Sequence, residues 1–151
     1  MIEIKEVDIK EVDIKEAIKV HKNIKEFNET KPEKEYFENR YKDREKLIIV
    51  AYYNNVPAGY IIGYDKFQDG KNFYCWMAGV DSKFRKLGIL TKMMQYQEKW
   101  AKQKGYSILK IKTRNNRREM LNFLVKNNFN FLSVEKRDNI QDNRINLQKE
   151  I

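Results

Sequence analysis

The chain has 151 residues, of which 41% are hydrophobic and 13% aromatic, with only two prolines. A chain of this size buries about two-thirds of its unfolded surface in one core, so we expect a single domain over residues 1–151. The net charge of +9 favours anionic partners such as nucleotides or phosphorylated cofactors. Lysines that are scattered among Glu and Asn are also typical of an ordinary solvated surface.

One cysteine, Cys75, and one histidine, His21, exclude several kinds of site. An internal disulfide cannot form, which indicates a reducing cytoplasm, and no zinc site of the usual kind can be built, so we expect no metal. Cys75 could be a thiol nucleophile only with an activating His, and the only His lies in the first helix, so we interpret Cys75 as a small buried hydrophobe. His21 is interpreted as a packing or surface residue, with an acid or base role as the alternative. Because no apolar run approaches the roughly 18 residues of a membrane span, we expect a soluble, untargeted protein with no membrane partner.

The chain begins with a pattern that changes from strand to helix. Ile2 and Ile4 alternate as in a β-strand, whereas from about Asp8 or Asp13 the apolar residues return every three or four positions. Asp13 and Glu16 have the spacing of a capping box, which predicts that a helix begins there.

A short second helix and three strands are expected next. Thr30 would cap the helix, with Glu33 three residues on and Pro32 in the first turn, where its missing N–H costs nothing. "LIIVAYY" and "VPAGYIIGYDKF", separated by the turn Asn54-Asn55, predict an antiparallel hairpin. "FYCWMAGV" is apolar on both faces, which is typical of a central strand.

The second half of the chain predicts two helices and three strands. "GILTKMMQYQEKWAKQKG" has a helical apolar face and ends at Gly105, where a left-handed residue is wanted. "YSILKIKT" reads as a strand, "NNRREMLNFLVKNN" as a helix opened by Asn115 and Asn116, and "FNFLSVEKR" and "NRINLQKEI" as strands. The expected order is therefore βααβββαβαββ, a mixed α/β (α+β) fold.

The loop between the strand that ends at Val80 and the long helix is typical of an anion site. The N-terminus of a helix carries free N–H groups, and Gly88 lets a ligand approach the backbone. Lys83, Arg85 and Lys86 add positive charge. The glycine spacing fits neither a P-loop nor a dinucleotide-binding fingerprint.

Two segments resemble the GNAT superfamily of N-acetyltransferases. "VDSKFRKLGILTKMM" is similar to the family's acetyl-CoA-binding segment, in which Arg or Gln is followed by two residues, Gly, one residue, and Gly or Ala; Arg85 and Gly88 match. "TRNNRREMLNFLVKNNF" is similar to the second segment, where an Asn opens a helix and Gly-Phe closes it. The resemblance follows the whole chain in element order and is specific over residues 78–129.

The resemblance implies a mostly antiparallel sheet of six to seven strands flanked by about four helices, with acetyl-CoA as co-substrate. Similar proteins are commonly homodimers, and no nucleic-acid partner is expected. The residues implied in cofactor binding are Ala78, Val80, Arg85, Lys86, Leu87, Gly88, Ile89, Leu90, Thr91, Asn115 and Asn116.

The chain departs from the family pattern at four positions. Leu90 replaces the last glycine, and its spacing predicts that it joins the buried helix face. Asn128 replaces the Gly before Phe and tolerates the same left-handed conformation. Leu124 stands where many members have a Tyr that protonates the leaving thiolate, and Tyr74 stands where the histone-acetylating branch has a Glu base. Tyr74 is the catalytic candidate, as a proton relay through water, or else a pocket wall.

The family mechanism implies direct attack of an amine on the thioester, polarised by a backbone N–H at the end of the "MAGV" strand. A primary amine is neutral in only about one molecule in 2,500 at pH 7, so a route for its proton matters. The acceptor would be a small molecule, a peptide N-terminus or a lysine. An N-acetyltransferase is the leading hypothesis, and a CoA-binding or regulatory module without turnover is the alternative.

A nucleic-acid-binding domain is a third hypothesis. Tyr52, Tyr53, Tyr60 and Tyr64 could stack on bases, although their alternation with Ile and Val fits ordinary sheet packing better. Such a domain would bind with a steep dependence on salt.

Overall fold

The computed structural model describes residues 7–27 and 33–151. Its strands are β1 (Val7–Glu11), β2 (Lys46–Tyr53), β3 (Val56–Tyr64), β4 (Asn72–Val80), β5 (Ile108–Arg114), β6 (Asn130–Glu135) and β7 (Arg144–Glu150). Its α-helices are α1 (Ile14–His21), α2 (Lys34–Tyr41), α3 (Ile89–Gln103) and α4 (Arg118–Lys126). Short 3₁₀ turns lie at Lys25–Phe27, Ser82–Phe84 and Ile140–Asp142. The predicted order of elements is confirmed.

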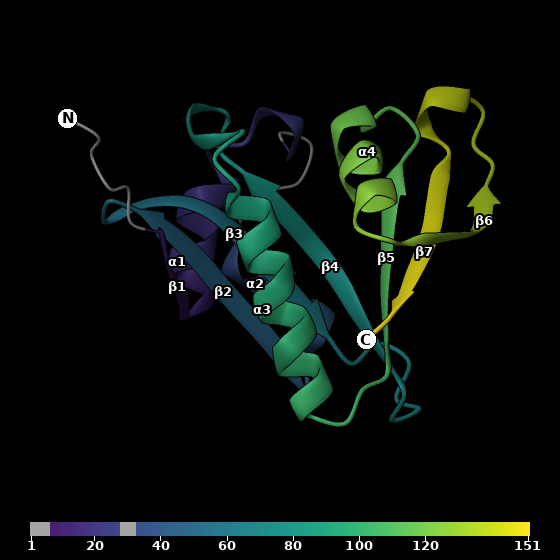
Figure 1. Ribbon diagram of the computed structural model, residues 1–151, viewed down its shortest axis with the longest axis horizontal. Helices are drawn as coiled ribbons and strands as arrows, with labels where there is room; N and C mark the ends of the chain where they lie inside the picture. The colour runs from purple at the N-terminus through teal and green to yellow at the C-terminus, as the bar shows by residue number, and fades with distance from the viewer. Residues whose placement is uncertain (1–6, 28–32) are drawn as a thin grey trace.

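The seven strands form one sheet in the order β1-β2-β3-β4-β5-β7-β6, with α1 and α2 on one face and α3 and α4 on the other (Figure 1). Neighbouring strands are antiparallel except for β4 and β5, which are parallel. The strand that is apolar on both faces, β4, is the central one, as its composition predicts. This mixed, mostly antiparallel sheet is the fold that the resemblance implied.

Each face of the sheet carries its own hydrophobic core, because side chains alternate along each strand. Ile49, Ile61 and Cys75 point toward α3, where Met93 and Met94 meet them. Ile48, Tyr60 and Tyr74 point the other way and pack with side chains of α1 and α2, such as Ile18 and Phe37. Residues that are neighbours on β4 therefore serve different cores.

The start of α1 differs from the predicted capping box. Asp13 caps the helix by accepting a hydrogen bond from the Lys15 N–H (2.8 Å). The Glu16 carboxylate instead accepts from Lys19 Nζ (2.6 Å) and from the Tyr52 hydroxyl on β2 (3.1 Å). The reciprocal half of the capping box was wrong, because a tertiary partner takes the Glu16 side chain.

Some expectations for the N-terminal third fall outside the part of the chain that is described. The predicted strand at Ile2 and Ile4 lies there, as do the cap Thr30 and Pro32. Within the described residues, α2 begins at Lys34, and Glu33 precedes it without a capping hydrogen bond from its side chain.

The helix α4 begins later than the sequence predicts. Asn115 and Asn116 were expected to open it, but the first helical residue is Arg118. The two asparagines form a turn whose backbone N–H groups donate to the carbonyls of Asn143 (2.8 Å) and Gln141 (3.1 Å). The turn is thus tied to the segment before β7 and does not cap the helix.

Both helix endings that were predicted from left-handed residues are confirmed. Gly105 follows α3 with φ of 98°, and Asn128 follows α4 with φ of 68°. The Phe129 N–H then donates to the Leu124 carbonyl (3.0 Å), which closes α4 in the usual way.

Asn128 provides a test of this ending. Asn128→Ala should lower the free energy of unfolding by about 1–2 kcal/mol, because alanine resists the left-handed region, whereas Asn128→Gly should leave it unchanged or slightly raised. Urea unfolding followed by circular dichroism measures both. Equal stability of the Ala and wild-type proteins would contradict the conformation assigned to Asn128.

Candidate functional site

The central feature of the site is the early parting of β4 and β5. The two strands pair only over Asn72–Cys75 and Ile108–Ile111, and then they diverge (Figure 1). The register between β3 and β4 also shifts between Ile62 and Gly63, which leaves Trp76 as a bulge. From Trp76 to Val80, β4 therefore has one edge that no strand covers.

The backbone of this open edge has a definite orientation. The Asp81 N–H donates to the Ala58 carbonyl of β3 (2.8 Å), so alternation along β4 turns the polar groups of Ala78 and Val80 toward the open side. The Val80 carbonyl confirms this orientation, because it accepts a hydrogen bond from Arg85 Nε on the open side (3.0 Å). The N–H groups of Ala78 and Val80 therefore face the split between the strands.

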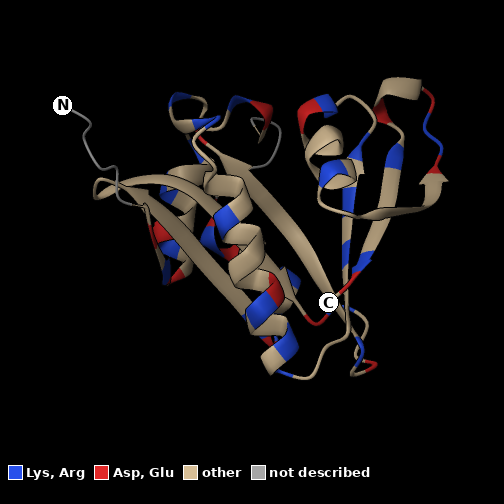
Figure 2. Ribbon diagram, in the orientation of Figure 1, with Lys and Arg blue, Asp and Glu red and all other residues tan. Residues whose placement is uncertain are grey.

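A cleft of about 1130 Å³ occupies the split. Residues of both halves of the sheet line it, together with the segments that begin α3 and α4. Nine lysines and arginines and two glutamates are among its described lining residues. Figure 2 shows basic residues on β5, β7 and α4, beside the split. The cleft is apolar along β4 and strongly positive elsewhere, which suits a ligand with both an apolar and an anionic part.

The segment that enters α3 forms an anion cradle. Gly88 has φ of 79°, and nothing lies within 4 Å of the position that a Cβ would take. The first helical hydrogen bond runs from the Lys92 N–H to the Gly88 carbonyl (3.1 Å). Within the described chain, the N–H groups of residues 86–91 donate to no acceptor. An array of this kind at a helix N-terminus binds phosphate.

A short segment after α1 crosses to this region. Arg85 pairs with Glu26 and lies 4.0 Å from a Glu119 oxygen. Arg117 donates to the Glu26 carbonyl, and its guanidinium lies 5.8 Å from the centroid of the Phe27 ring. Glu26 and Phe27 are thus held between the two loops that precede α3 and α4, at the wall of the cleft.

Most residues that the resemblance assigned to cofactor binding meet at the cleft. Leu87 and Asn115 do not line it; Leu87 is exposed, and the Asn115 side chain donates to the Ile140 carbonyl (3.1 Å). Those that line it are Ala78, Val80, Arg85, Lys86, Gly88, Ile89, Leu90, Thr91 and Asn116.

The prediction that Leu90 joins the buried helix face holds in part, because Leu90 packs against the core but remains only half-buried. Leu90 is half-buried and lines the cleft, while its neighbour Ile89 is 1% exposed and joins Met93 in the core. The helix starts at Ile89, so the buried stripe begins one residue earlier than the apolar spacing suggested. A side chain, and not bare backbone, therefore stands at the cradle where the family pattern has its last glycine.

Tyr74 lies where the two strands part. Its ring packs against Tyr64 (5.7 Å between centroids), and Lys66 Nζ stands 4.6 Å from its centroid. Burial raises the pKa of Tyr74 well above its ordinary value. The phenol therefore stays protonated at neutral pH, which suits a hydrogen-bond donor or a relay and not a base. Leu124, at the position of the family's usual Tyr, is fully buried.

Sequence reasoning missed several lining residues that reach the cleft from other elements. Arg40 comes from α2 and places its guanidinium 5.1 Å from the ring of Trp76 on β4. Glu26 and Phe27 come from the segment after α1. Arg40 and the pair Glu26 and Phe27 lie on separate elements, so no local pattern in the sequence brings them to the cleft.

The remaining residues that were considered for a chemical or binding role have packing roles in the core. His21 is 2% exposed and hydrogen-bonds through Nδ1 to the Tyr60 hydroxyl (2.5 Å), inside the core under α1. Tyr60 and Tyr64 are buried, so they cannot stack on bases as the nucleic-acid hypothesis requires. Cys75 is fully buried, and burial raises the pKa of its thiol to about 12.

Comparison with known proteins places the chain among acetyltransferases. The model of the acetyltransferase (GNAT) family matches residues 14–129. No curated protein matches the sequence.

Solved structures share the fold over nearly the whole chain. Ard1 from Thermoplasma volcanium has a TM-score of 0.77 at 15% identity, covering 96% of this chain and 97% of its own. A GNAT family acetyltransferase from Elizabethkingia anophelis with acetyl-CoA bound has a TM-score of 0.72 at 20% identity, with 96% and 98% covered. The ribosomal-protein-S18-alanine N-acetyltransferase from Escherichia coli has a TM-score of 0.76 at 12% identity, with 97% and 94% covered.

Cys75 offers a direct test of the packing around β4. A buried thiol with a raised pKa should not react with iodoacetamide in the folded protein at pH 8, and it should react fully in urea. Mass spectrometry of the alkylated chain measures both states. Rapid alkylation of the folded protein would show that the thiol is reachable and would reopen a chemical role for it.

Proposed function

Since the chain belongs to the GNAT family of acetyltransferases, we propose that it acts as one acetyltransferase domain that moves the acetyl group of acetyl-CoA directly to a primary amine while both substrates are bound. The observation that carries the proposal is the open edge of β4, which leads from the cradle of N–H groups to the point where the strands part. Acetyl-CoA supplies the activated thioester, and the chain supplies the position and the hydrogen bonds.

The residues present fit acetyl-CoA in two parts. The N–H groups of residues 86–91, with Lys86 and the arginines before α4, would hold the phosphates. The N–H groups of Ala78 and Val80 face the split, where they would bind the amides of the pantetheine arm and polarise the thioester oxygen. These donors are part of a β-strand, so they are already oriented before the ligand arrives.

Tyr74 is the residue best placed to handle a proton. Because its phenol stays protonated, it can donate one proton while it accepts another from water, which is a relay and not a net base. Neither Leu124 nor Leu90 can transfer a proton, because both side chains are apolar. The acetyl transfer then depends mainly on holding the amine and the thioester together, with Tyr74 as the proton path.

The acceptor and the compartment are further parts of the proposal. The Escherichia coli relative is named for an alanine of a ribosomal protein. The cleft described above reaches Arg40 and Trp76 on the side of α1 and α2. An amine would enter from that side. A free, buried Cys75 suits the cytoplasm. Within residues 7–27 and 33–151, no helix has the length and apolar character to cross a membrane.

Thermal unfolding tests the function first. Acetyl-CoA at about a hundredfold its dissociation constant adds roughly 2.7 kcal/mol of stability, so the Tm should rise by several degrees, whereas an RNA oligomer should not raise it. Thiol release with a panel of primary amines should then show turnover. Binding of acetyl-CoA without thiol release would favour the alternative of a CoA-binding module, which Leu124 in place of the usual Tyr already suggests.

Gly88→Trp should abolish binding of acetyl-CoA in calorimetry, because the indole would fill the cradle. The matched control is Gly105→Trp at the other end of α3, which also has positive φ and open space at its Cβ. Both variants should lose about 1–2 kcal/mol of stability from the left-handed residue, and the control should still bind. Equal affinity of the two variants would refute the cradle. Arg85→Ala should weaken binding less than Gly88→Trp.

Tyr74→Phe should lower kcat about a hundredfold and leave the affinity for acetyl-CoA unchanged. Since the pKa of Tyr74 is raised, its proton is retained as pH rises, so wild-type kcat should show no loss from this group up to about pH 10. Tyr96→Phe on α3 is the control. A variant with wild-type kcat across the pH range would remove Tyr74 from the mechanism.

A further inference from the structure

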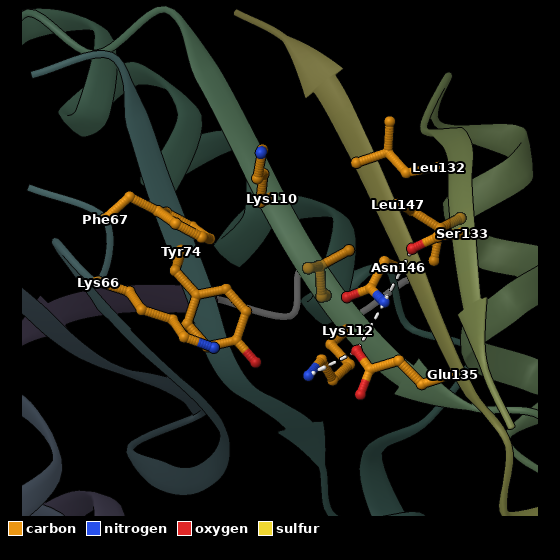
Figure 3. Close-up of a pocket in the computed structure, with 11 residues that line it drawn as sticks. Lys66, Phe67, Tyr74, Lys110, Lys112, Leu132, Ser133, Glu135, Asn146 and Leu147 are labelled. Atoms are coloured by element: carbon orange, nitrogen blue, oxygen red, sulfur yellow. Dashed lines mark hydrogen bonds and ion pairs between the residues drawn. The ribbon is translucent and has the colours of Figure 1, made fainter. Parts of the chain in front are cut away.

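A second, smaller cavity adjoins the cleft where β4 and β5 part. It has a volume of about 330 Å³ and shares Tyr74, Ile111 and Lys112 with the cleft as walls (Figure 3). Tyr74 belongs to the core under α1 and α2, and Lys110 and Lys112 alternate with β5 residues that face α3 and α4. The cavity therefore opens on the face from which an acceptor would approach.

Three lysines line this cavity, so we name it the lysine pocket: Lys66 from the loop after β3, and Lys110 and Lys112 from β5. Glu135 on β6 is the only carboxylate among its described lining residues. It pairs with Lys112 Nζ (2.9 Å) and accepts from the Asn146 amide (2.9 Å). These contacts hold the pKa of Glu135 at about 2, so the carboxylate stays ionised and already has its partners.

Lys66 and Lys110 have no carboxylate partner in the part of the chain that is described. Their ammonium groups lie over aromatic rings instead. Lys66 Nζ is 4.6 Å from the centroid of Tyr74, and Lys110 Nζ is 4.9 Å from that of Phe67. Both lysines are half-buried. Cation–π contacts orient these charges but do not neutralise them.

The positive charges of Lys66 and Lys110 are therefore not balanced by a carboxylate within the described lining of the lysine pocket. Burial lowers the pKa of Lys66, and the like charges of Lys112 and Arg40 lower it further. Arg40 is the next cation, and its Nε donates to the Tyr64 hydroxyl (2.8 Å). An anion beside Lys66 would relieve this repulsion and would form a charge-assisted hydrogen bond with its ammonium group. Lys110 lies beyond the ring of Phe67 and adds positive charge to the same pocket (Figure 3).

We infer that the acceptor is a small primary amine that also carries an anionic group, a carboxylate or a phosphate, bound by Lys66 in the lysine pocket, with Lys110 adding positive charge beyond Phe67. The amine would then point toward the parting of β4 and β5, past Tyr74. The volume suits a molecule of amino-acid size, and the ring of Phe67 and the side chain of Leu132 would cover its carbon chain. This inference rests on the proposed acetyl transfer.

Matched pairs of acceptors test it. O-phosphoethanolamine is compared with ethanolamine, and β-alanine with propylamine, by thiol release from acetyl-CoA. The anionic member of at least one pair should have a kcat/KM at least tenfold higher, mainly through a lower KM. A preference within the first pair alone indicates a phosphate site, and within the second pair a carboxylate site.

Variants assign the effect to the pocket. Lys66→Met with Lys110→Met should remove the preference within each pair of acceptors. The measured quantity is the ratio of the two kcat/KM values in one variant, so a change in overall rate from the loss of Lys66 beside Tyr74 does not affect it. Lys66→Glu should reverse the preference in favour of the neutral amines. Lys99→Met, an exposed lysine on α3, is the control and should keep the wild-type preference.

A binding measurement separates this inference from the function on which it rests. Calorimetry with O-phosphoethanolamine and β-alanine in the presence of CoA needs no turnover. Turnover with all amines at equal kcat/KM would overturn the inference and leave the transferase intact. Binding that depends on Lys66 and Lys110, with no thiol release, would support the lysine pocket and overturn the transfer; neither binding nor preference would overturn the pocket.

Discussion

The site depends on the incomplete pairing of β4 with β5. This is the only parallel pair among the described strands, and it ends after four residues on each strand. A buried strand edge without a partner is costly, because backbone N–H and C=O groups need hydrogen bonds. Here the Val80 carbonyl finds Arg85, while the N–H groups of Ala78 and Val80 face a cleft. The fold thus leaves two backbone donors facing the cleft, where amide or carbonyl oxygens of a ligand can accept their hydrogen bonds.

Different helices cover the two halves of the sheet on one face. The long helix α3 packs on β2, β3 and β4, while α4 covers β5 and β7 with Leu121 and Leu124. On the other face, Gly79 lets the segment after α1 approach closely. A Cβ at Gly79 would lie 2.7 Å from carbon atoms of Ile24 and Phe27. The absence of a side chain on β4 therefore decides how near Phe27 comes to the cleft.

Local signals in the sequence predicted much of this arrangement. The left-handed endings at Gly105 and Asn128 depend on neighbouring residues, and both are confirmed. The apolar stripe of α3 is also local and is confirmed, except that its first buried residue is Ile89. Features that depend on distant residues were missed or misplaced. The Glu16 side chain binds Tyr52 on β2 and not its predicted capping partner. The turn at Asn115 is hydrogen-bonded to the segment before β7.

The same reasoning explains why the cradle could be found from sequence and the lysine pocket could not. The donors of the cradle are consecutive, from residue 86 to residue 91. Lys110 and Glu135 lie on strands that the sheet register brings together, and Lys66 comes from the loop after β3. Along the chain, each lysine looks like one more solvated charge in a protein that has many.

Charge balance in the cleft indicates which donors control phosphate binding. Arg85 is already paired with Glu26 and lies near Glu119, so a phosphate would have to replace a carboxylate there and would gain only the difference. The N–H groups of residues 86–91 have no acceptor within the described chain, so a phosphate there displaces only water and no carboxylate. The backbone array should therefore contribute more to affinity than the arginine that the sequence motif emphasises. The larger contribution of the backbone also explains how Leu90 can replace a glycine, because the N–H of residue 90 remains in the array whatever its side chain.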